Sequence, residues 1–282
     1  MGPHNPASKT PKRIVISCSM KLIRAVSMLT IMFAAGLANV YSVSADETKS
    51  SKLLLAIFAH PDDETICAGL LARAVTTGWE VQVVFATSGD AGSDASGRNL
   101  KGAALGKERE REGANALAAL GVRLPPTFLG FGDGSVTQSR LLVKERLVKE
   151  LGRLKPEVIV TFGPDGFTGH ADHIAVGKAT DEAAKEITAA CAVYNAVLGK
   201  QLEGWAAVAG VAVPKGAKLP ENLVTVDVKQ FQAQRLASLD CHKTQWTPEI
   251  QAKLRDFRRA YPFEEFVWSG GGLGAPGKWV GP

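Results

Sequence analysis

An alternation of apolar runs and amphipathic segments, repeated four times, is the feature that most constrains the fold of this chain. The first apolar run spans residues 53–58 without interruption, which is typical of a strand buried on both faces of a sheet. The same criteria predict further strands at residues 80–86, 127–131 and 157–162, and helices at residues 64–77, 107–120, 139–154 and 172–188. Strands that alternate with helices favour a parallel sheet. The predicted fold class is therefore α/β, with a mostly parallel sheet covered by helices on both faces.

The pattern becomes less regular after the fourth predicted helix. Strand-like runs at residues 192–198 and 223–228 and a helical segment at residues 229–239 continue the fold. The last forty residues are rich in Trp, Pro and Gly, so we expect an irregular C-terminal cap there. The expected organisation is one domain over residues 53–246, followed at residues 247–282 by a cap or by an extension of the same domain.

The first 45 residues have the features of a secretory signal peptide. Residues 1–45 contain five basic side chains and no acidic one. Lys21 and Arg24 precede an apolar stretch at residues 28–38, and small residues stand near the end of the segment. We therefore expect a signal peptide that is cleaved after Ala45.

The start and the fate of this segment each have a second interpretation. Met20 is an alternative translation start, which would shorten the signal peptide. An uncleaved membrane anchor is the alternative to cleavage, because residues 25–45 carry no charge. With cleavage, residues 46–52 would form a polar linker, and the mature protein would be exported to the periplasm or secreted, with no stable membrane insertion.

The formal net charge of +5 resides in this leader, because the remainder of the chain holds equal numbers of basic and acidic residues. A neutral chain with 7% aromatic residues lacks the basic surface and the stacking rings that nucleic acids require, so we expect no nucleic-acid partner. Cys67, Cys191 and Cys241 lie outside the leader. An odd, widely spaced set of cysteines favours buried free thiols over a disulfide framework, although one bond could form among them.

Three of the four histidines outside the leader lie in two short segments that follow predicted strands. The first strand runs directly into His60-Pro61-Asp62-Asp63-Glu64, and the fourth leads into a loop that ends in Gly169-His170-Ala171-Asp172-His173. Ligands of open parallel sheets bind beyond the carboxyl ends of the strands. Two imidazoles and one carboxylate are a common ligand set for catalytic zinc, which keeps a position for water.

His60 and Asp63 lie three residues apart at a predicted strand-to-helix turn, so both can face one metal ion. His173, at the start of the helix after the fourth strand, is the natural third ligand. Asp62 lies between two of these ligands and could take the proton from a metal-bound water, whose pKa the metal lowers. We therefore interpret His60, Asp63 and His173 as a metal site and Asp62 as its general base.

Two further residues of the second motif could assist the reaction. His170 can reach the same cleft and, in its charged form, could stabilise an oxyanion or protonate a leaving amine, while Asp172 could hold that charge. Each motif alone also has a structural interpretation, since acids at a helix start complement the helix dipole and a histidine near a strand end is often an ordinary loop residue. The joint occurrence of the two motifs favours metal chemistry.

Together, the two motifs resemble those of the LmbE-like/PIG-L deacetylase family. Weaker matches occur at Arg109-x-x-Glu112, at Leu129-Gly130 with Asp133, and at Cys241-His242-Lys243-Thr244-Gln245, so that the resemblance covers roughly residues 53–246. It implies a Rossmann-like sheet and a zinc ion on His60, Asp63 and His173, with iron(II) as the alternative metal. It also implies the removal of N-acetyl groups from glucosamine-containing substrates, with Asp62 as general base.

The resemblance assigns roles to the weaker matches as well. Arg109 and Asp133 match positions that contact the sugar or its aglycone, and His242 lies in a motif that borders the active site. The ordinary alternatives are an ion pair of Arg109 along its helix and a helix-capping role for His242. Thr168 stands where some relatives carry a tyrosine that polarises the substrate carbonyl. Zinc and His170 would then act alone on the oxyanion, or another donor would enter from the cap.

The sequence therefore predicts a zinc-dependent hydrolase that removes an N-acetyl group from an N-acetylated amino sugar or glycoconjugate. One alternative is an amidase for a larger amide conjugate, in which the cap selects the acyl group. Another is a non-catalytic carbohydrate-binding protein, which the presence of Asp62 and an open metal position disfavour. Export favours amino sugars of the cell envelope or the environment as substrates, and the sequence does not indicate an oligomeric state.

Overall fold

The computed structural model describes residues 52–187, 191–210 and 220–270. The expected signal peptide, nearly all of the linker and the end of the expected cap lie outside these described residues. Within the described part, no helix combines the length and the apolar character needed to cross a bilayer.

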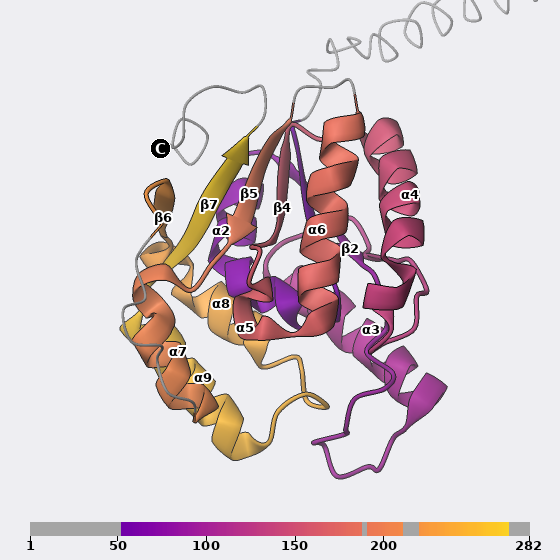
Figure 1. Ribbon diagram of the computed structural model, residues 1–282. Coiled ribbons are helices and arrows are strands. Elements are labelled where there is room, and N and C mark those ends of the chain that lie inside the picture. Colours follow the sequence, from indigo (N-terminus) through magenta and orange to yellow (C-terminus); the bar gives the residue numbers. More distant parts are fainter. Residues whose placement is uncertain (1–51, 188–190, 211–219, 271–282) are drawn as a thin grey trace, which may run out of the picture. The chain divides into compact units, whose positions relative to one another are not determined.

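The described residues form a seven-stranded sheet in the order β3-β2-β1-β4-β5-β7-β6 (Figure 1). The strands are β1 Leu53–Phe58, β2 Glu80–Phe85, β3 Thr127–Phe128, β4 Val158–Phe162, β5 Ala192–Ala196, β6 Leu223–Asp227 and β7 Phe263–Gly270. Strands β1 to β5 pair in parallel, whereas β7 pairs antiparallel with both β5 and β6. The chain builds outward from β1 through β2 to β3 and then crosses back to β4 on the other side of β1. The carboxyl ends of β1 and β4 therefore flank the position where strand order reverses, which is where open α/β sheets bind ligands.

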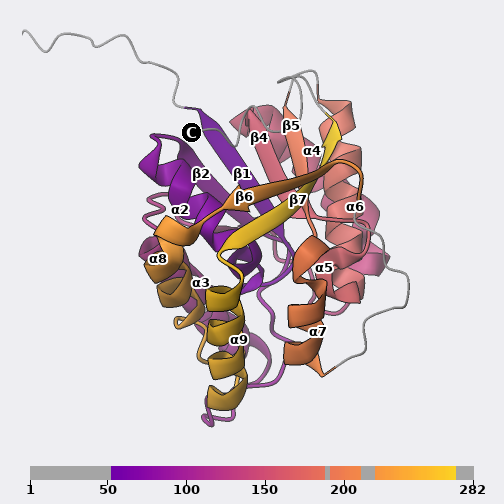
Figure 2. The same ribbon diagram turned by 90° about the vertical axis from the view of Figure 1, so that its left-hand side faces the viewer.

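Helices cover both faces of the sheet (Figures 1 and 2). They are α2 Ala68–Thr76, α3 Gly102–Ala119, α4 Val136–Leu154, α5 Gly166–Gly169, α6 Ala171–Glu186, α7 Leu202–Ala209, α8 Gln232–Leu239 and α9 Pro248–Ala260, with short 3₁₀ helices at η1 Asp63–Cys67, η2 Gly199–Gln201 and η3 Lys229–Phe231. Helices α4 and α6 pack together on one face, and α2 and α8 pack on the other. The predicted fold class, an α/β sheet with helices on both sides, is confirmed.

Strand β1 lies at the centre of the core, as its uninterrupted apolar sequence predicts. Every residue of β1 is buried, and Leu54, Leu55 and Phe58 are fully inaccessible to solvent. Each such side chain contributes about 1.5–3 kcal/mol of hydrophobic stabilisation. The strand is therefore a rigid support for the residues that follow it. Cys67, Cys191 and Cys241 are free thiols, and the first two are buried.

Helix α3 begins at Gly102, five residues before the predicted start. Four of the five residues before the predicted start are Gly or Ala, so this stretch carried no amphipathic signal. Gly106 explains part of this composition, because a Cβ atom there would lie 3.1 Å from the Cβ of Asp90 and 3.2 Å from that of Ser88. A small residue thus lets the loop after β2 pass close to the helix.

The C-terminal segment differs from the expected irregular cap. It contains helix α9 and strand β7, and β7 lies inside the sheet between β5 and β6. The two consecutive acids of this strand, Glu264 and Glu265, are both buried. Glu264 accepts hydrogen bonds from the backbone N–H groups of Gly69 and Leu70 at 2.9 Å and from Arg235 Nε at 3.1 Å. These buried donors therefore compensate the carboxylate of Glu264, a residue type that is usually exposed.

Candidate metal centre and active site

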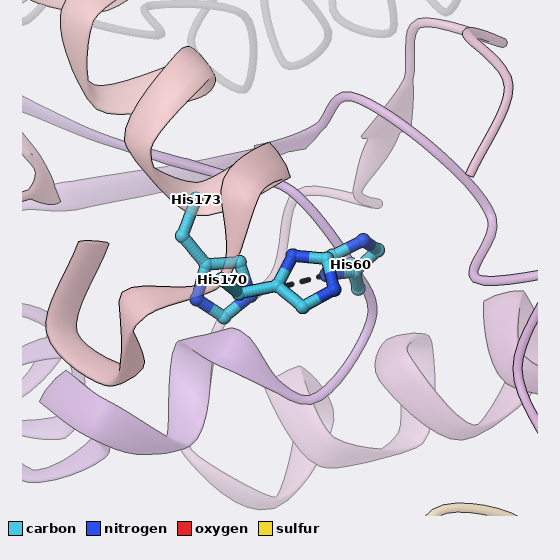
Figure 3. Close-up of side chains that lie close together, drawn as sticks. All are labelled: His60, His170 and His173. Atoms are coloured by element: carbon cyan, nitrogen blue, oxygen red, sulfur yellow. Dashed lines mark hydrogen bonds between the residues drawn. The ribbon is translucent and has the colours of Figure 1, made fainter. Parts of the chain in front are cut away.

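The side chains of His60, Asp63 and His173 converge where β1 and β4 end. His60 follows β1 directly, Asp63 begins η1, and His173 lies in the first turn of α6. The distance from His60 Nδ1 to His173 Nε2 is 3.2 Å, and His60 Nδ1 lies 3.5 Å from Asp63 Oδ2. The third side of the triangle, His173 Nε2 to Asp63 Oδ1, is 3.1 Å. In Figure 3 a dashed line marks the contact between the rings of His60 and His173, and the ring of His170 lies close to both.

These separations suit a tetrahedral divalent ion. Zinc bonds to nitrogen and oxygen are about 2.0–2.1 Å long, so two ligand atoms in a tetrahedral site lie about 3.3–3.4 Å apart. The three observed separations bracket this value. The separations from the two imidazoles end on different oxygens of Asp63, so the three side chains lie close enough to share one ion through one or the other oxygen, with at least one coordination position left for water or substrate.

The ring of His173 is fixed by contacts on its far side. Its Nδ1 lies 3.0 Å from the carbonyl oxygen of Gly166, to which a proton on Nδ1 donates, so Nε2 is left as the metal-facing atom. The ring also stacks on Phe162 with centroids 4.3 Å apart. Thr168 Oγ1 lies 3.3 Å from the same Nδ1. At the position where some relatives carry a tyrosine, this chain thus has a hydroxyl that contacts a histidine of the triangle.

The ring of His60 is fixed by two carboxylates. Its Nε2 lies 3.0 Å from Asp133 Oδ1 and 3.4 Å from Asp172 Oδ2, so a proton on Nε2 donates to them and Nδ1 faces the triangle. Carboxylates behind a ligating histidine commonly set its orientation and raise its basicity. Asp133 was expected to contact the sugar, but its second oxygen accepts from the Ala91 N–H at 2.9 Å. In this structure both oxygens of Asp133 are therefore occupied by the protein itself.

His60 also belongs to two other groups of potential ligands. Its nitrogen atoms lie within 4.8 Å of ligand atoms of His170 and His173, and likewise of Asp133 and Asp172. The carboxylate of Asp172 already accepts from the N–H groups of Gly134 at 2.7 Å and Val136 at 3.1 Å. Asp63 Oδ2 likewise accepts from the backbone N–H of His60 at 2.7 Å, but Asp63 Oδ1 faces His173 Nε2, so we take the triangle of His60, Asp63 and His173 as the candidate metal site.

The electrostatics of the cluster favour a positive charge at its centre. Burial lowers the pKa of His60, but Asp133, Asp172 and Asp63 outweigh burial and raise the pKa to about 12. Burial also lowers the pKa of His173, and Asp63 reverses the shift so that the net pKa is raised. The same two imidazoles hold the pKa of Asp63 well below its usual range in spite of its burial. A site this rich in carboxylates stabilises a proton or a metal cation between its side chains.

Asp62 has a strained backbone and an elevated pKa. Its φ angle of 132° lies in a region that residues other than glycine rarely adopt, and such strain is common at functional sites. Its N–H donates to Glu64 Oε2 at 3.0 Å. Desolvation of the carboxyl group, with the charge of Asp63, raises the pKa of Asp62 to about 7. A carboxylate with this pKa can accept and return a proton at neutral pH.

A buried ion pair stands behind this turn. Glu64 Oε1 lies 2.6 Å from His242 Nε2, and both side chains are inaccessible to solvent. Burial lowers the pKa of His242, but Glu64 outweighs it and raises the pKa. His242 was expected to border the active site as a substrate contact, and its burial contradicts direct contact. Its observed role is to hold Glu64, which in turn binds the N–H of Asp62.

The rest of the segment around His242 binds the first motif and α3. Gln245 Nε2 donates to the carbonyl oxygen of Pro61 at 2.6 Å. Thr244 donates to Glu112 through its N–H at 3.0 Å and through its hydroxyl at 2.6 Å. These contacts explain two of the weak sequence matches. The segment from Cys241 to Gln245 holds the turn at Pro61, and Glu112 of the Arg109-x-x-Glu112 match holds that segment through Thr244.

Arg109 holds the loop that follows β2. Its Nη1 donates to the carbonyl oxygen of Gly89 at 2.7 Å and its Nη2 to that of Ser93 at 2.9 Å. A Cβ at Gly92 would collide with Nη1, so a glycine is required there. Arg109 was expected to contact the sugar, but both of its terminal nitrogens donate to backbone carbonyl oxygens. The alternative, an ion pair along its own helix, is not observed among the described residues either.

His170 is exposed beside the triangle, with its ring 5.0 Å from that of His60 and 4.8 Å from that of His173 (Figure 3). Its Nδ1 accepts from the backbone N–H of Asp172 at 3.2 Å, so the proton of the neutral ring resides on Nε2. Burial, His173 and His60 lower the pKa of His170. The expectation that Asp172 holds His170 in its charged form is therefore wrong, since the carboxylate of Asp172 binds His60 and the loop before α4. His170 is instead a neutral N–H donor.

A pocket of about 200 Å³ adjoins the triangle. Asp62, Asp63 and His173 contribute to its lining together with mainly apolar and aromatic residues, and these are Ile66, Phe162, Phe167, Trp205, Leu239, Trp246 and Leu254, with Thr65, Thr168 and Arg258. The part of this lining that comes from α7, α8, α9 and the segment between the last two was not predicted. Single apolar residues on separate helices carry no motif that could have identified them.

Comparison with known proteins supports the resemblance. The chain matches the family described as PIG-L: GlcNAc-PI de-N-acetylase over residues 55–184. It is 32% identical over 173 residues to a 1D-myo-inositol 2-acetamido-2-deoxy-alpha-D-glucopyranoside deacetylase of Corynebacterium jeikeium, a match that covers 49% of this chain and 52% of the relative. The chain thus spans about half the length of that relative. The protein of the same name from Mycolicibacterium gilvum is 30% identical over 229 residues, covering 69% of this chain and 81% of the relative.

Solved structures show the same fold. The N,N'-diacetylchitobiose deacetylase from Pyrococcus horikoshii superposes with a TM-score of 0.59 at 21% identity, covering 83% of this chain and 87% of that one. The family match includes both strand-end motifs, and the similarity to the Mycolicibacterium protein extends over four fifths of its length. This chain therefore belongs to the PIG-L (LmbE-like) family.

Proposed function

We propose that this protein is a metal-dependent hydrolase that removes an N-acetyl group from an N-acetylglucosamine-type amino sugar or glycoconjugate. The observation that carries the proposal is the triangle of His60, Asp63 and His173, with Asp62 beside it. The names of the relatives support this substrate class, since they are deacetylases of acetamido sugars. The position of Asp62 beside these three side chains favours a hydrolase over a binding protein, because a carboxylate there can take a proton from a bound water.

His60, Asp63 and His173 would hold the ion, with zinc as the proposed metal and iron(II) as the alternative. When bound there, the metal would lower the pKa of water and polarise the amide carbonyl. The family resemblance and the donor set of two imidazoles and one carboxylate support zinc.

The protein's own groups supply the proton transfers and the orientation. Asp62 takes the proton from the attacking water, and its strained backbone is held by Glu64 while it does so. The Nε2–H of His170 donates to the amide oxygen as that oxygen gains negative charge, which stabilises the transition state. Asp62 then returns the proton to the leaving nitrogen, so that acetate and the free amine are the products.

The pH dependence follows from the state of Asp62. The base must be unprotonated to accept a proton, and its pKa is about 7. The rate should therefore fall as the pH decreases through this value and should level off above it.

The leader supports export as the location of this activity. Its basic start, apolar core and small residues before residue 46 favour a cleaved signal peptide, with an uncleaved anchor as the alternative. N-terminal sequencing of the protein recovered from its host would distinguish the two, because cleavage predicts a mature chain that begins at Asp46.

The substitution Asp62→Asn tests the proposed function directly. Acetate release from N-acetylglucosamine and its glycosides should fall by about 10²–10⁴-fold. The bound metal should remain at the wild-type level, because Asp62 is not one of the three proposed ligands. Wild-type turnover in the variant would exclude Asp62 as the base, and failure of the metal-loaded wild type to release acetate from any such substrate would overturn the deacetylase assignment.

A further inference from the structure

The pocket beside the triangle is larger and less polar than an acetyl group requires. Its volume is about 200 Å³, whereas a water-sized group such as a methyl occupies about 30 Å³. Most of its lining is apolar or aromatic, including Trp205, Trp246 and Leu254. The part of the lining formed by Trp205, Trp246 and Leu254 offers little to the hydroxyl groups of a sugar. The pocket therefore suits the acyl side of the substrate, and the exposed side near His170 suits the sugar.

One cationic side chain lines this otherwise apolar part of the pocket. Arg258, in the last turn of α9, is only 4% exposed. Within the described residues its guanidinium has neither a hydrogen bond nor an ion pair, and its recorded contact is with the ring of Phe257, whose centroid lies 5.5 Å away. Buried arginines are normally paired with an acid, because an unpaired buried charge is costly.

Glu264, the acid that acts electrostatically on Arg258, is already paired elsewhere. Glu264 contributes to the electrostatic environment of Arg258, but its carboxylate is already shared between Arg235 and two backbone N–H groups. Arg235 itself retains a buried Nη2 without a partner. The ion pair of Glu264 is thus with Arg235, and Arg258 has no carboxylate partner among the described residues. Burial, with the charge of Arg235, lowers the pKa of Arg258 to about 10, so the group still carries its charge at neutral pH.

We propose that Arg258 binds a carboxylate at the end of the substrate's acyl group, so that the enzyme accepts N-acyl amino sugars whose acyl group is derived from a dicarboxylic acid. This inference rests on the proposed function for the position of the scissile amide. The amide carbonyl would lie at the triangle, an apolar spacer would lie against Trp205 and Trp246, and the terminal carboxylate would meet the guanidinium.

The single cation determines the class of anion. A planar carboxylate of charge −1 matches one guanidinium in a two-bond arrangement. A phosphate of charge near −2 would need further donors, and no other lysine or arginine is among the described residues that line the pocket. The acids Asp62 and Asp63 at the triangle repel the free carboxylate, which favours binding with that group directed toward Arg258.

The test compares charged and neutral acyl groups of equal length on glucosamine. The pairs are N-succinyl with N-butanoyl, N-glutaryl with N-pentanoyl, and N-adipoyl with N-hexanoyl, with N-acetyl measured in parallel. For at least one pair, kcat/KM of the metal-loaded wild type should be about 10–100-fold higher for the charged member. No preference for the charged member in any pair would overturn the inference, and acetate release in the same assay would show that the proposed function still stands.

Variants then assign the preference to one side chain. Arg258→Met should bring the ratio of charged to neutral kcat/KM close to one, and Arg258→Lys should retain part of it. Arg259→Met is the matched control, because Arg259 is exposed on the same helix and pairs with Asp256, and the ratio should stay at its wild-type value. A wild-type ratio in folded Arg258→Met would also overturn the inference. If that variant does not fold, the Arg258→Lys ratio decides, because an unchanged ratio there would contradict two-bond recognition by a guanidinium.

Binding measurements keep the two proposals separate. Calorimetric titration of Asp62→Asn with N-adipoylglucosamine and N-hexanoylglucosamine requires no turnover. Tighter binding of the charged compound supports the anion site even if no amide is hydrolysed, an outcome that would overturn only the proposed function. Equal affinities for the two compounds, together with equal turnover, would overturn the inference, because Arg258 would then have a structural role only.

Discussion

The triangle and the pocket beside it differ in how completely their polar groups are paired. Around the triangle, His60 contacts Asp133 and Asp172, His173 contacts Gly166, and these partners bind further backbone groups. In the pocket, Arg258 is buried without a polar partner among the described residues. A cluster whose polar groups are all paired holds one geometry. An unpaired buried charge is costly, and a bound ligand of opposite charge would reduce that cost. On the proposed function, the triangle would set the chemistry and the pocket would select the substrate.

The two regions also come from different parts of the chain. The triangle belongs to residues 55–184, which match the family, whereas the pocket wall on α7, α8 and α9 lies outside that match. The Glu64–His242 pair and the Gln245–Pro61 hydrogen bond join the two parts. Different C-terminal segments could therefore change substrate choice without altering the metal site.

Loss of a proposed ligand should have the largest effect. His173→Ala removes one corner of the triangle, so bound metal should be lost and acetate release should fall by at least about 10⁴-fold. Metal analysis and turnover of the same sample check this. His170→Ala is the matched control, since it removes a neighbouring imidazole that is not in the triangle and should leave the metal content unchanged. Retention of metal by His173→Ala would contradict the assignment.

Breaking the link between the regions should destabilise the fold. His242→Ala leaves Glu64 charged and buried without its partner, which should lower the free energy of unfolding by about 3–5 kcal/mol. Chemical denaturation measures this change. The exposed substitution Lys253→Ala, which removes an ion pair with Glu249, should change the same quantity by less than about 1 kcal/mol. Equal effects of the two substitutions would show that the buried pair is not a structural link.

Weakening the support of His60 should have a moderate effect. Asp133→Asn removes a carboxylate from behind the ring, and the affinity for metal should fall by about 10–100-fold. Competition with a chelator of known affinity measures the change. An unchanged affinity, with the fold intact, would mean that Asp133 serves the substrate rather than the ligand, as the family resemblance implied.

Changes in the pocket should have the smallest effect on an acetylated substrate. Trp205 lines the pocket and is assigned to the part that longer acyl groups would contact, so Trp205→Leu should change kcat/KM for N-acetylglucosamine by less than about threefold. The same variant should reduce turnover of longer N-acyl groups by a larger factor. A large loss with the acetyl substrate would show that the pocket takes part in the chemistry and would break the division between the two regions.

The sequence could predict the triangle because its members are rare residue types that directly follow buried strands. Asp62, Asp63 and both histidines of the triangle are found in two short segments, and parallel topology brings those segments together. The parallel part of the sheet was predictable from its apolar runs, of which the uninterrupted run of β1 is the clearest. The structure places His60 and His173 within the reach of one ion, as these motifs indicated.

The remaining features depend on partners that are distant in the sequence. Glu264 and Glu265 lie near the start of β7, and their hydrogen-bond partners come from distant parts of the sequence. The contact of Glu64 with His242 spans 178 residues, and no local pattern signals it. Arg258 resembles any basic residue near a helix end until the structure shows that it is buried beside a pocket.

Titration of metal-free protein with zinc, with acetate release followed at each addition, tests the central claim most directly. Activity should rise in proportion to bound zinc and stop rising at one ion per chain, because one triangle of side chains is expected to hold one ion. Full turnover without metal, or a rise that continues to several ions per chain, would contradict the account.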